Sequence, residues 1–147
     1  MRLYVAGSSS SGNCYLLYDE REILILECGV PFKNINGLPF FDLEKVVGCV
    51  ISHEHGDHAG RINEFLDYGV DCLASSGTIN SLSFTSKRLP LMIEEGVTVM
   101  AGAFSIVPFK IAHDAKEPLG FLIDHPDMGP ILFATDTYML YYRFPNL

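Results

Sequence analysis

The chain has 147 residues, of which 48% are hydrophobic and 19% are charged, and its formal net charge is −8. This length suits one domain, predicted over residues 1–147, and the composition excludes a disordered or fibrous chain. The acidic balance argues against broad electrostatic attachment to nucleic acid or anionic membranes, so a nucleic-acid substrate would need focused contacts or metal ions.

The first third of the chain predicts β-strands. Three β-rich runs, separated by a Ser/Gly loop and a charged turn, cover residues 2–6, 14–18 and 22–27. Residues 30–41 contain Pro, Gly and Asn and predict a loop with at most one short helix. The first apolar stretch breaks at Gly7, too early for a signal peptide.

The middle and end of the chain mix helices with strands. A strand is expected over residues 48–52, followed by a helix over 59–68, with Ile62, Phe65 and Leu66 on one face. Beyond it the sequence predicts strands over 71–74, 97–100, 104–111, 119–124 and 131–135, a helix over 76–84, and a turn or single helical turn over 91–95. His125 is expected in an exposed hairpin loop. This order predicts α/β or α+β layering.

The four cysteines are widely spaced, without a C-x-x-C pair. Three of Cys14, Cys28, Cys49 and Cys72 fall in apolar segments, which predicts buried reduced thiols rather than disulfides or metal ligands. No apolar run approaches membrane-spanning length. We therefore expect a cytoplasmic protein that does not bind membranes.

Three of the five histidines lie within six residues, in the segment H-E-H-G-D-H that follows the strand over 48–52. If the backbone is still extended at His53 and His55, both imidazoles point to the same side. Asp57 and His58 then follow at a turn, so that four donors converge. Imidazole and carboxylate together suit zinc, and also manganese or iron, better than calcium. Solvated surface histidines beside a capping aspartate are the alternative, and four donors in this spacing favour the metal.

This segment resembles the signature of the metallo-β-lactamase superfamily. In that family an acid before glycine ends an earlier strand, a further histidine follows a later strand, and an aspartate stands in a T-D-T context. The corresponding residues here are Glu27, His113 and Asp136. The resemblance implies an αββα sandwich that is incomplete in its C-terminal half, because it covers nearly all of this chain but only the front half to two-thirds of a family domain.

The resemblance also implies roles for particular residues. It assigns one metal to His53, His55 and His113 and a second to Asp57 and His58, with Asp136 bridging both; Zn²⁺ is expected, with Mn²⁺ or Fe as alternatives. Asp57 and His58 would be the catalytic pair. Glu27, which replaces the family's usual aspartate, would orient the signature loop, and Thr137 would support a ligand by a hydrogen bond. The family's last histidine, a ligand of the second metal, has no counterpart here.

The implied chemistry is hydrolysis by a metal-bound hydroxide. The serine-rich loop over residues 7–13 resembles a small bacterial and phage branch with nuclease and phosphodiesterase members, which favours a phosphodiester substrate, nucleic acid included. On its chemistry alone, the same loop is equally well explained as a flexible hairpin. A thioester or lactone hydrolase is the alternative enzyme, and a catalytically inactive metal-binding or structural module is the other alternative.

The last residues of the sequence indicate that this chain packs against another polypeptide segment. The segment over 138–144 is rich in aromatic residues, and a shortened second layer would leave apolar sheet surface exposed. Such surface is rare on a soluble monomer. We therefore expect a homo-oligomer or a place within a longer polypeptide.

Overall fold

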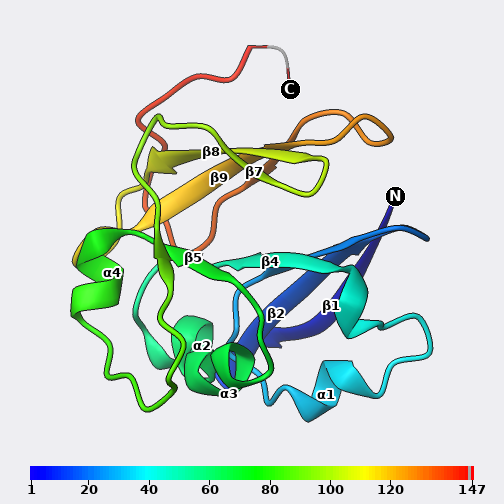
Figure 1. Ribbon diagram of the computed structural model, residues 1–147. Coiled ribbons are helices and arrows are strands. Elements are labelled where there is room, and N and C mark those ends of the chain that lie inside the picture. Colours follow the sequence, from blue (N-terminus) through cyan, green and yellow to red (C-terminus); the bar gives the residue numbers. More distant parts are fainter. Residues whose placement is uncertain (146) are drawn as a thin grey trace.

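Two β-sheets pack face to face in the computed structural model, which describes residues 1–145 and 147 (Figure 1). The first sheet contains, in spatial order, β1 (Arg2–Ser9), β2 (Gly12–Tyr18), β3 (Ile23–Leu26), β4 (Val46–Val50), β5 (Cys72–Ala74) and β6 (Leu91–Met92). Strands β1 to β3 pair antiparallel, and strands β3 to β6 pair parallel.

The second sheet is antiparallel throughout. Its strands, in sequence order, are β7 (Val99–Ala101), β8 (Phe104–Lys110), β9 (Leu119–Asp124) and β10 (Ile131–Phe133). Strand β9 lies between β8 and β10 and runs antiparallel to both. Strands β8 and β10 therefore run in the same direction, and both have their C-terminal ends at the same end of the sheet.

Short helices complete the fold. They are α1 (Lys33–Asn36), the 3-10 helix η1 (Leu43–Lys45), α2 (Gly56–Ala59), α3 (Ile62–Asp67) and α4 (Ser76–Asn80). Helices α1, α2 and α3 lie on the face of the first sheet that points away from the second sheet (Figure 1). None of the helices in the described part of the chain has the length and apolar character needed to cross a membrane.

Strand β3 shows how the layers form. Its four residues are all buried: Ile23 and Ile25 belong to the core beneath the helices, whereas Leu24 and Leu26 belong to the core between the sheets. A strand covered on both faces needs apolar side chains on both faces, which explains the unbroken apolar run.

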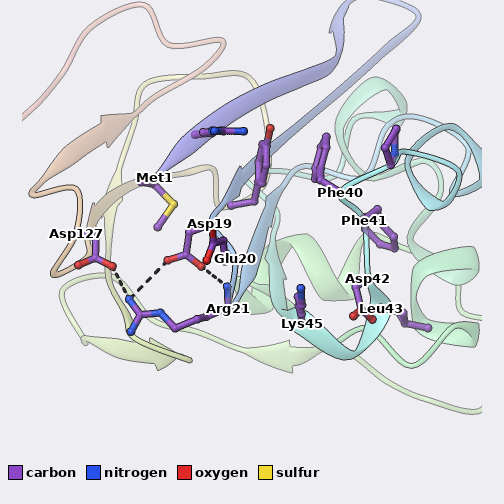
Figure 2. A pocket seen from close by; sticks show the side chains of 13 residues that line it. Met1, Asp19, Glu20, Arg21, Phe40, Phe41, Asp42, Leu43, Lys45 and Asp127 are labelled. Carbon is purple, nitrogen blue, oxygen red and sulfur yellow. Dashed lines mark hydrogen bonds and ion pairs between the residues drawn. The ribbon is translucent and has the colours of Figure 1, made fainter.

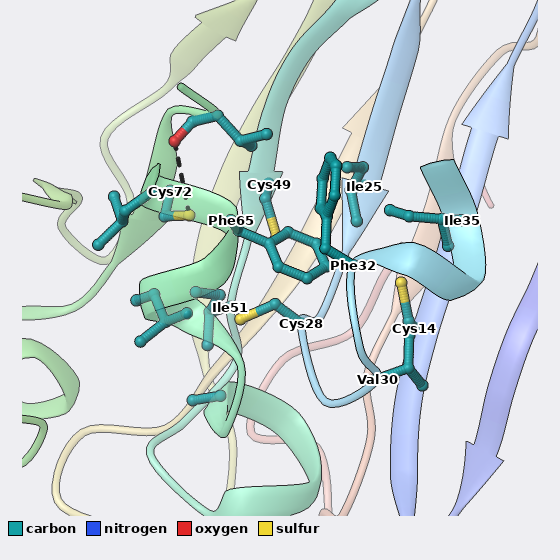
Figure 3. Close-up of a cluster of buried hydrophobic side chains, with 14 of the residues drawn as sticks. Cys14, Ile25, Cys28, Val30, Phe32, Ile35, Cys49, Ile51, Phe65 and Cys72 are labelled. Atoms are coloured by element: carbon teal, nitrogen blue, oxygen red, sulfur yellow. Dashed lines mark hydrogen bonds between the residues drawn. The ribbon is translucent and has the colours of Figure 1, made fainter. Parts of the chain in front are cut away.

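The four cysteines lie in the helix-side core, beside Phe32 and Phe65 (Figure 3). All four are buried free thiols, as the sequence predicted. Burial raises the pKa of Cys14 to about 12 and that of Cys28 to about 11. These two thiols are therefore neutral near pH 7.

The layering confirms the predicted α/β class, with helices, the first sheet and the second sheet in that order. The outer face of the second sheet carries the C-terminal tail instead of a helix, as far as the described residues show. Phe144 packs on Phe109 with ring centroids 5.0 Å apart, and Lys110 lies over the ring of Tyr141. The fourth layer of the predicted sandwich is thus represented by an irregular segment.

Three predicted elements were wrong in detail. The helix expected over 59–68 begins only at Ile62, as α3, because α2 ends at Ala59 and the Arg61 N–H then donates to the Cys28 carbonyl (3.0 Å) outside the helix. Residues 91–95 begin with strand β6, which pairs parallel with β5. The strand expected to continue to Ser52 ends at Val50.

Candidate metal centre

Four chain segments that are far apart in the sequence meet at one end of the two sheets. Glu27 follows β3 and His53 follows β4, and these neighbouring strands run parallel, so their C-terminal ends coincide. His113 follows β8 and Asp136 follows β10, and the C-terminal ends of these two strands lie at the same end of the second sheet. Polar groups at the carboxyl ends of strands commonly form binding sites, because the loops there leave the sheet together.

The first candidate ligand group contains His53, His55 and His113, whose ring nitrogens lie within 4.8 Å of one another. His113 Nε2 is 3.2 Å from His55 Nδ1. Because β4 ends at Val50, His53 and His55 lie in the loop after the strand, and their imidazoles point to the same donor group.

His53 supplies the test of whether these residues fit a metal. Its Nδ1 lies 2.8 Å from Ser52 Oγ, whereas its buried Nε2 has no hydrogen-bond partner among the described residues. Burial, followed by the neighbouring His58, His113 and His55, lowers the pKa of His53 to about 3, so the imidazole is neutral. An unpartnered buried nitrogen is costly unless a ligand satisfies it. The neutral ring facing two further imidazoles fits a zinc-type ion.

Glu27 orients the buried side of the centre. Its carboxylate is fully buried and accepts hydrogen bonds from the Ser52 N–H (2.7 Å) and the Ser52 hydroxyl (2.8 Å). It also contacts Nδ1 of His58. One carboxylate thus fixes His58 directly and His53 through Ser52, with the Nε2 atoms of both rings turned towards the centre. Carboxylates behind ligating histidines commonly set their orientation in this way.

Glu27 and His58 hold a proton between them. Burial raises the pKa of Glu27, although hydrogen bonds from His58 and Ser52 oppose this effect. Burial acts to lower the pKa of His58, but the hydrogen bond to Glu27 and the carboxylates of Asp57 and Asp136 outweigh it, and the pKa is raised. Both shifts favour a proton that stays within the pair.

The second candidate group contains Asp57, His58 and Asp136, again within 4.8 Å. His58 Nε2 is 2.8 Å from Asp136 Oδ2 and 3.3 Å from Asp57 Oδ2. The same oxygen of Asp136 is 3.6 Å from His53 Nε2 and 4.0 Å from His113 Nε2. Asp136 therefore lies between the two groups.

Two residues of the centre have an unusual backbone. Glu27 (φ 68°) and Asp136 (φ 55°) are the non-glycine residues with positive φ in the described part of the chain. This left-handed conformation is unfavourable for most residues with a side chain, and it is often found at functional sites. The turn at Glu27 places its carboxylate behind His58, and the turn at Asp136 places its carboxylate between the two donor groups.

Thr137 and Glu54 form hydrogen bonds with the main chain on either side of His113. Thr137 Oγ1 accepts from the Ala112 N–H (3.1 Å) and donates to the Met139 carbonyl (2.6 Å), so its contacts are with backbone beside His113 and not with a candidate ligand. Glu54 Oε1 accepts from the Lys116 N–H (2.9 Å) and ties the signature loop to the loop after β8.

The exposed-loop prediction for His125 was wrong. His125 is buried, and its ring packs against Phe104 with centroids 4.6 Å apart. Its Nε2 lies 2.8 Å from Glu22 Oε1, and its Nδ1 accepts from the Asp127 N–H (3.1 Å). Both ring nitrogens are therefore satisfied within the fold, at a position that the hairpin pattern alone did not reveal.

A third group of donors lies elsewhere, beside a surface groove of about 1020 Å³ (Figure 2). Asp19, His125 and Asp127 have donor atoms within 4.8 Å of one another. Figure 2 shows the Arg21 side chain reaching towards both carboxylates, and its guanidinium pairs with Asp127 and lies 3.9 Å from Asp19 Oδ2. The guanidinium of Arg21 therefore already provides a positive charge at this cluster.

Comparisons with known proteins identify the family and the fold. The family model described as "Metallo-beta-lactamase superfamily" matches residues 9–91. The curated protein Exodeoxyribonuclease WalJ of Streptococcus pneumoniae is 28% identical, over 92% of this chain and 54% of the relative. The chain thus spans about half the length of the curated relatives that it matches.

Solved structures show the same fold at low sequence identity. A Cronobacter sakazakii metallo-beta-lactamase with a HARLDQ motif has a TM-score of 0.73 at 14% identity, covering 94% of this chain and 59% of that one. The metallo-beta-lactamase fold protein YhfI from Bacillus subtilis has a TM-score of 0.69 at 17% identity, covering 88% and 60%. The subclass B3 enzyme MEM-A1, from a soil metagenome, has a TM-score of 0.72 at 20% identity, covering 90% and 59%.

Proposed function

Because the chain belongs to the metallo-beta-lactamase superfamily, we propose that it acts as a metal-dependent hydrolase of phosphodiester bonds, including those of nucleic acid. The observation that carries this proposal is the convergence of three imidazoles and Asp136 around the unpartnered Nε2 of His53. The likeness to an exodeoxyribonuclease supports the choice of phosphodiesters over thioesters or lactones.

The two donor groups define where metals would bind. His53, His55 and His113 would hold the first ion, and Asp57 and His58 the second, with Asp136 facing both. Three imidazoles favour zinc, whereas the carboxylate-rich second group also accommodates manganese or iron. Metals bound there would lower the pKa of a coordinated water and offset negative charge on the substrate.

The chain's own groups would prepare the site. Glu27 holds the rings of His53 and His58, so little side-chain freedom remains to be lost when a ligand binds. Asp57 would orient the attacking group beside the second ion, and Asp136 would keep the two donor groups in one arrangement. The loop of His113 is held in turn by Glu54.

The charge of the chain makes metal important for substrate binding as well as for hydrolysis. A net charge of −8 repels a phosphodiester at long range, and Asp57 and Asp136 add negative charge at the centre itself. We therefore expect phosphodiester binding to depend on a divalent cation. A cytoplasmic location stays a prediction.

An inactive metal-binding module is the competing proposal, and one observation favours it. Within the described chain, the second group offers only Asp57, His58 and Asp136, and the side chain of Asp136 is 40% exposed. A weakly held second ion would leave a metal site with little hydrolytic activity.

Metal content and hydrolysis, measured on the same preparations, test the proposal. The chain loaded with Zn²⁺ or Mn²⁺ should cleave bis(p-nitrophenyl) phosphate faster than a chromogenic thioester. His55→Ala should lose the first metal and the activity, whereas the control His125→Gln, outside the centre, should keep both. An unchanged metal content in His55→Ala would refute the ligand assignment. Bound metal with faster thioester cleavage would favour the alternative enzyme, and bound metal without hydrolysis would favour the inactive module.

A further inference from the structure

Asn13 reaches the second donor group from the hairpin that joins β1 and β2. It lies in β2, is only 8% exposed, and pairs with Ser8 across the hairpin. We infer that Asn13 is a positioning residue for Asp57. By fixing the Asp57 carboxylate, it controls how tightly the second donor group binds a metal ion. This inference rests on the proposed function, because it requires Asp57 to be a metal ligand.

The side-chain amide of Asn13 contacts Asp57 at two atoms. Its Nδ2 donates to Asp57 Oδ2 (3.2 Å) and to the Asp57 main-chain carbonyl (3.2 Å). It also donates to the Ser9 carbonyl (3.0 Å) and lies 3.4 Å from His58 Nε2. One amide group therefore contacts the carboxylate, the backbone of the same residue, and the neighbouring candidate ligand.

Asn13 is itself held in one orientation. The Tyr15 hydroxyl donates to Asn13 Oδ1 (3.3 Å). The amide oxygen therefore points towards Tyr15, and the NH₂ group points towards Asp57. The Asn13 carbonyl accepts from the Gly29 N–H (2.9 Å), which fixes the main chain. The NH₂ end is consequently presented to the carboxylate, whereas the reversed amide would place oxygen against oxygen.

Close backbone packing fixes the main chain of Asp57. A Cβ atom at Gly29 would lie 1.8 Å from the Asp57 carbonyl oxygen and 2.8 Å from the Asn13 nitrogen. A Cβ at Gly12 would lie 2.5 Å from the Gly29 oxygen. These glycines allow the hairpin, the loop after β3 and the turn at Asp57 to pack backbone to backbone. The freedom that remains at Asp57 is the rotation of its side chain, which Asn13 restricts.

A neutral amide suits this task better than a charged group. A lysine would pair with Asp57 and compete with a cation for the carboxylate, and an aspartate would repel it. The amide donates a hydrogen bond but leaves the full negative charge available. Asn13 can thus set the direction of the carboxylate without weakening its attraction for a metal.

The experiment is a Zn²⁺ titration of the metal-free full chain, with the number of bound ions checked by elemental analysis. Asn13→Ala should weaken the second binding event by about 10- to 100-fold, as is typical when a partner of a ligand is lost, and leave the first unchanged. Asn13→Leu, which keeps a side chain of similar size but removes the amide donor, should weaken it to a similar degree. Tyr15→Phe, which keeps Asn13 but frees its amide, should have the smallest effect.

Asn63→Ala is the matched control. Asn63 also connects two backbone segments through its amide, donating to the Ser83 carbonyl (3.0 Å) and accepting from the Thr85 N–H (2.9 Å), but it makes no contact with the centre. It should leave both binding events unchanged. Thermal unfolding of each metal-free variant separates a loss of fold from a loss of binding, and Tyr15→Phe provides the comparison if the Asn13 variants unfold.

The possible outcomes are distinct. Two binding events in the wild type, with the second weakened only in the Asn13 and Tyr15 variants, support the inference. Two events that persist unchanged in Asn13→Ala overturn the inference but leave the proposed function intact. A wild type that binds only one ion overturns the inference but leaves the proposed function to the hydrolysis assay, and a wild type that binds none overturns both. An equal weakening of the two events overturns the inference, because it shows a general structural role for Asn13.

Discussion

The two sides of the candidate centre are built in different ways. On the side of the first sheet, Glu27, Ser52, His53 and His58 are all buried and joined by hydrogen bonds. On the side of the second sheet, the side chains of His113 and Asp136 are 14% and 40% exposed. The first side is a buried hydrogen-bonded network, whereas the second side is more exposed and reaches the centre through the packing of the sheets and the contact between Glu54 and the Lys116 N–H.

This difference separates stability from ligand binding. Buried polar groups are costly when unsatisfied, so each member of the network on the first side depends on the others. Asp136, the more exposed of the two residues on the second side, can be removed at little cost, since water replaces its contacts. We therefore expect substitutions on the first side to destabilise the fold, and substitutions on the second side to affect metal binding alone.

The largest expected effect is at Glu27. Glu27→Ala removes the partner of the Ser52 N–H and of His58 and leaves them buried without an acceptor. The free energy of unfolding should fall by about 3–5 kcal/mol, as for a broken buried pair. Denaturant unfolding of metal-free protein measures it. Glu44→Ala, at an exposed site, is the control, and similar losses at both positions would contradict the contrast between the two sides.

A smaller effect of a different kind is expected at Asp136. Asp136→Gly removes a candidate bridging carboxylate but suits the backbone, because φ is 55°. The free energy of unfolding should change by no more than about 1 kcal/mol, since glycine adopts this conformation without strain. Metal content should nevertheless fall. A destabilisation as large as that of Glu27→Ala would show that the second side also supports the fold.

The same contrast explains what the sequence could predict. Residues 53–58 were identified from spacing alone, since their donors are close in the chain. Glu27, His113 and Asp136 came from a family resemblance, because nothing local reveals that β8 and β10 run in the same direction on either side of β9. Their roles as ligands stay predictions. The sequence did not single out Asn13, because an asparagine after a Ser/Gly hairpin usually indicates only a turn.

The burial of His125 was missed for a similar reason. Its hairpin residues, with Pro126 and Gly129, are typical of an exposed turn. The partner that satisfies its Nε2 is Glu22, which lies about a hundred positions earlier in the chain. Local composition predicts where a chain turns, but it does not predict which distant carboxylate will form a hydrogen bond with a buried histidine.

The cysteines offer a probe of the rigid side. Because burial raises the pKa of Cys14 to about 12 and of Cys28 to about 11, and neither is exposed, a thiol reagent should react only when the helix-side core opens. Labelling of the native chain with a disulfide reagent should be slow, and all four thiols should react in denaturant. Glu27→Ala should accelerate labelling, whereas Asp136→Gly should not. Rapid labelling of the native wild type would show that the first side is not rigid.

The smallest effect on the fold, and the last prediction, concerns the tail beside the exposed side. Tyr138, Met139 and Tyr141 are 82%, 57% and 51% exposed. Apolar surface of this extent is uncommon on a monomer and favours association. The isolated chain should therefore self-associate at micromolar concentration, measured by light scattering. Replacing Met139 and Tyr141 by Ser should reduce the associated fraction without changing denaturant unfolding, because these side chains contribute little to either core. A wild-type chain that stays monomeric would show that the exposed tail does not drive association.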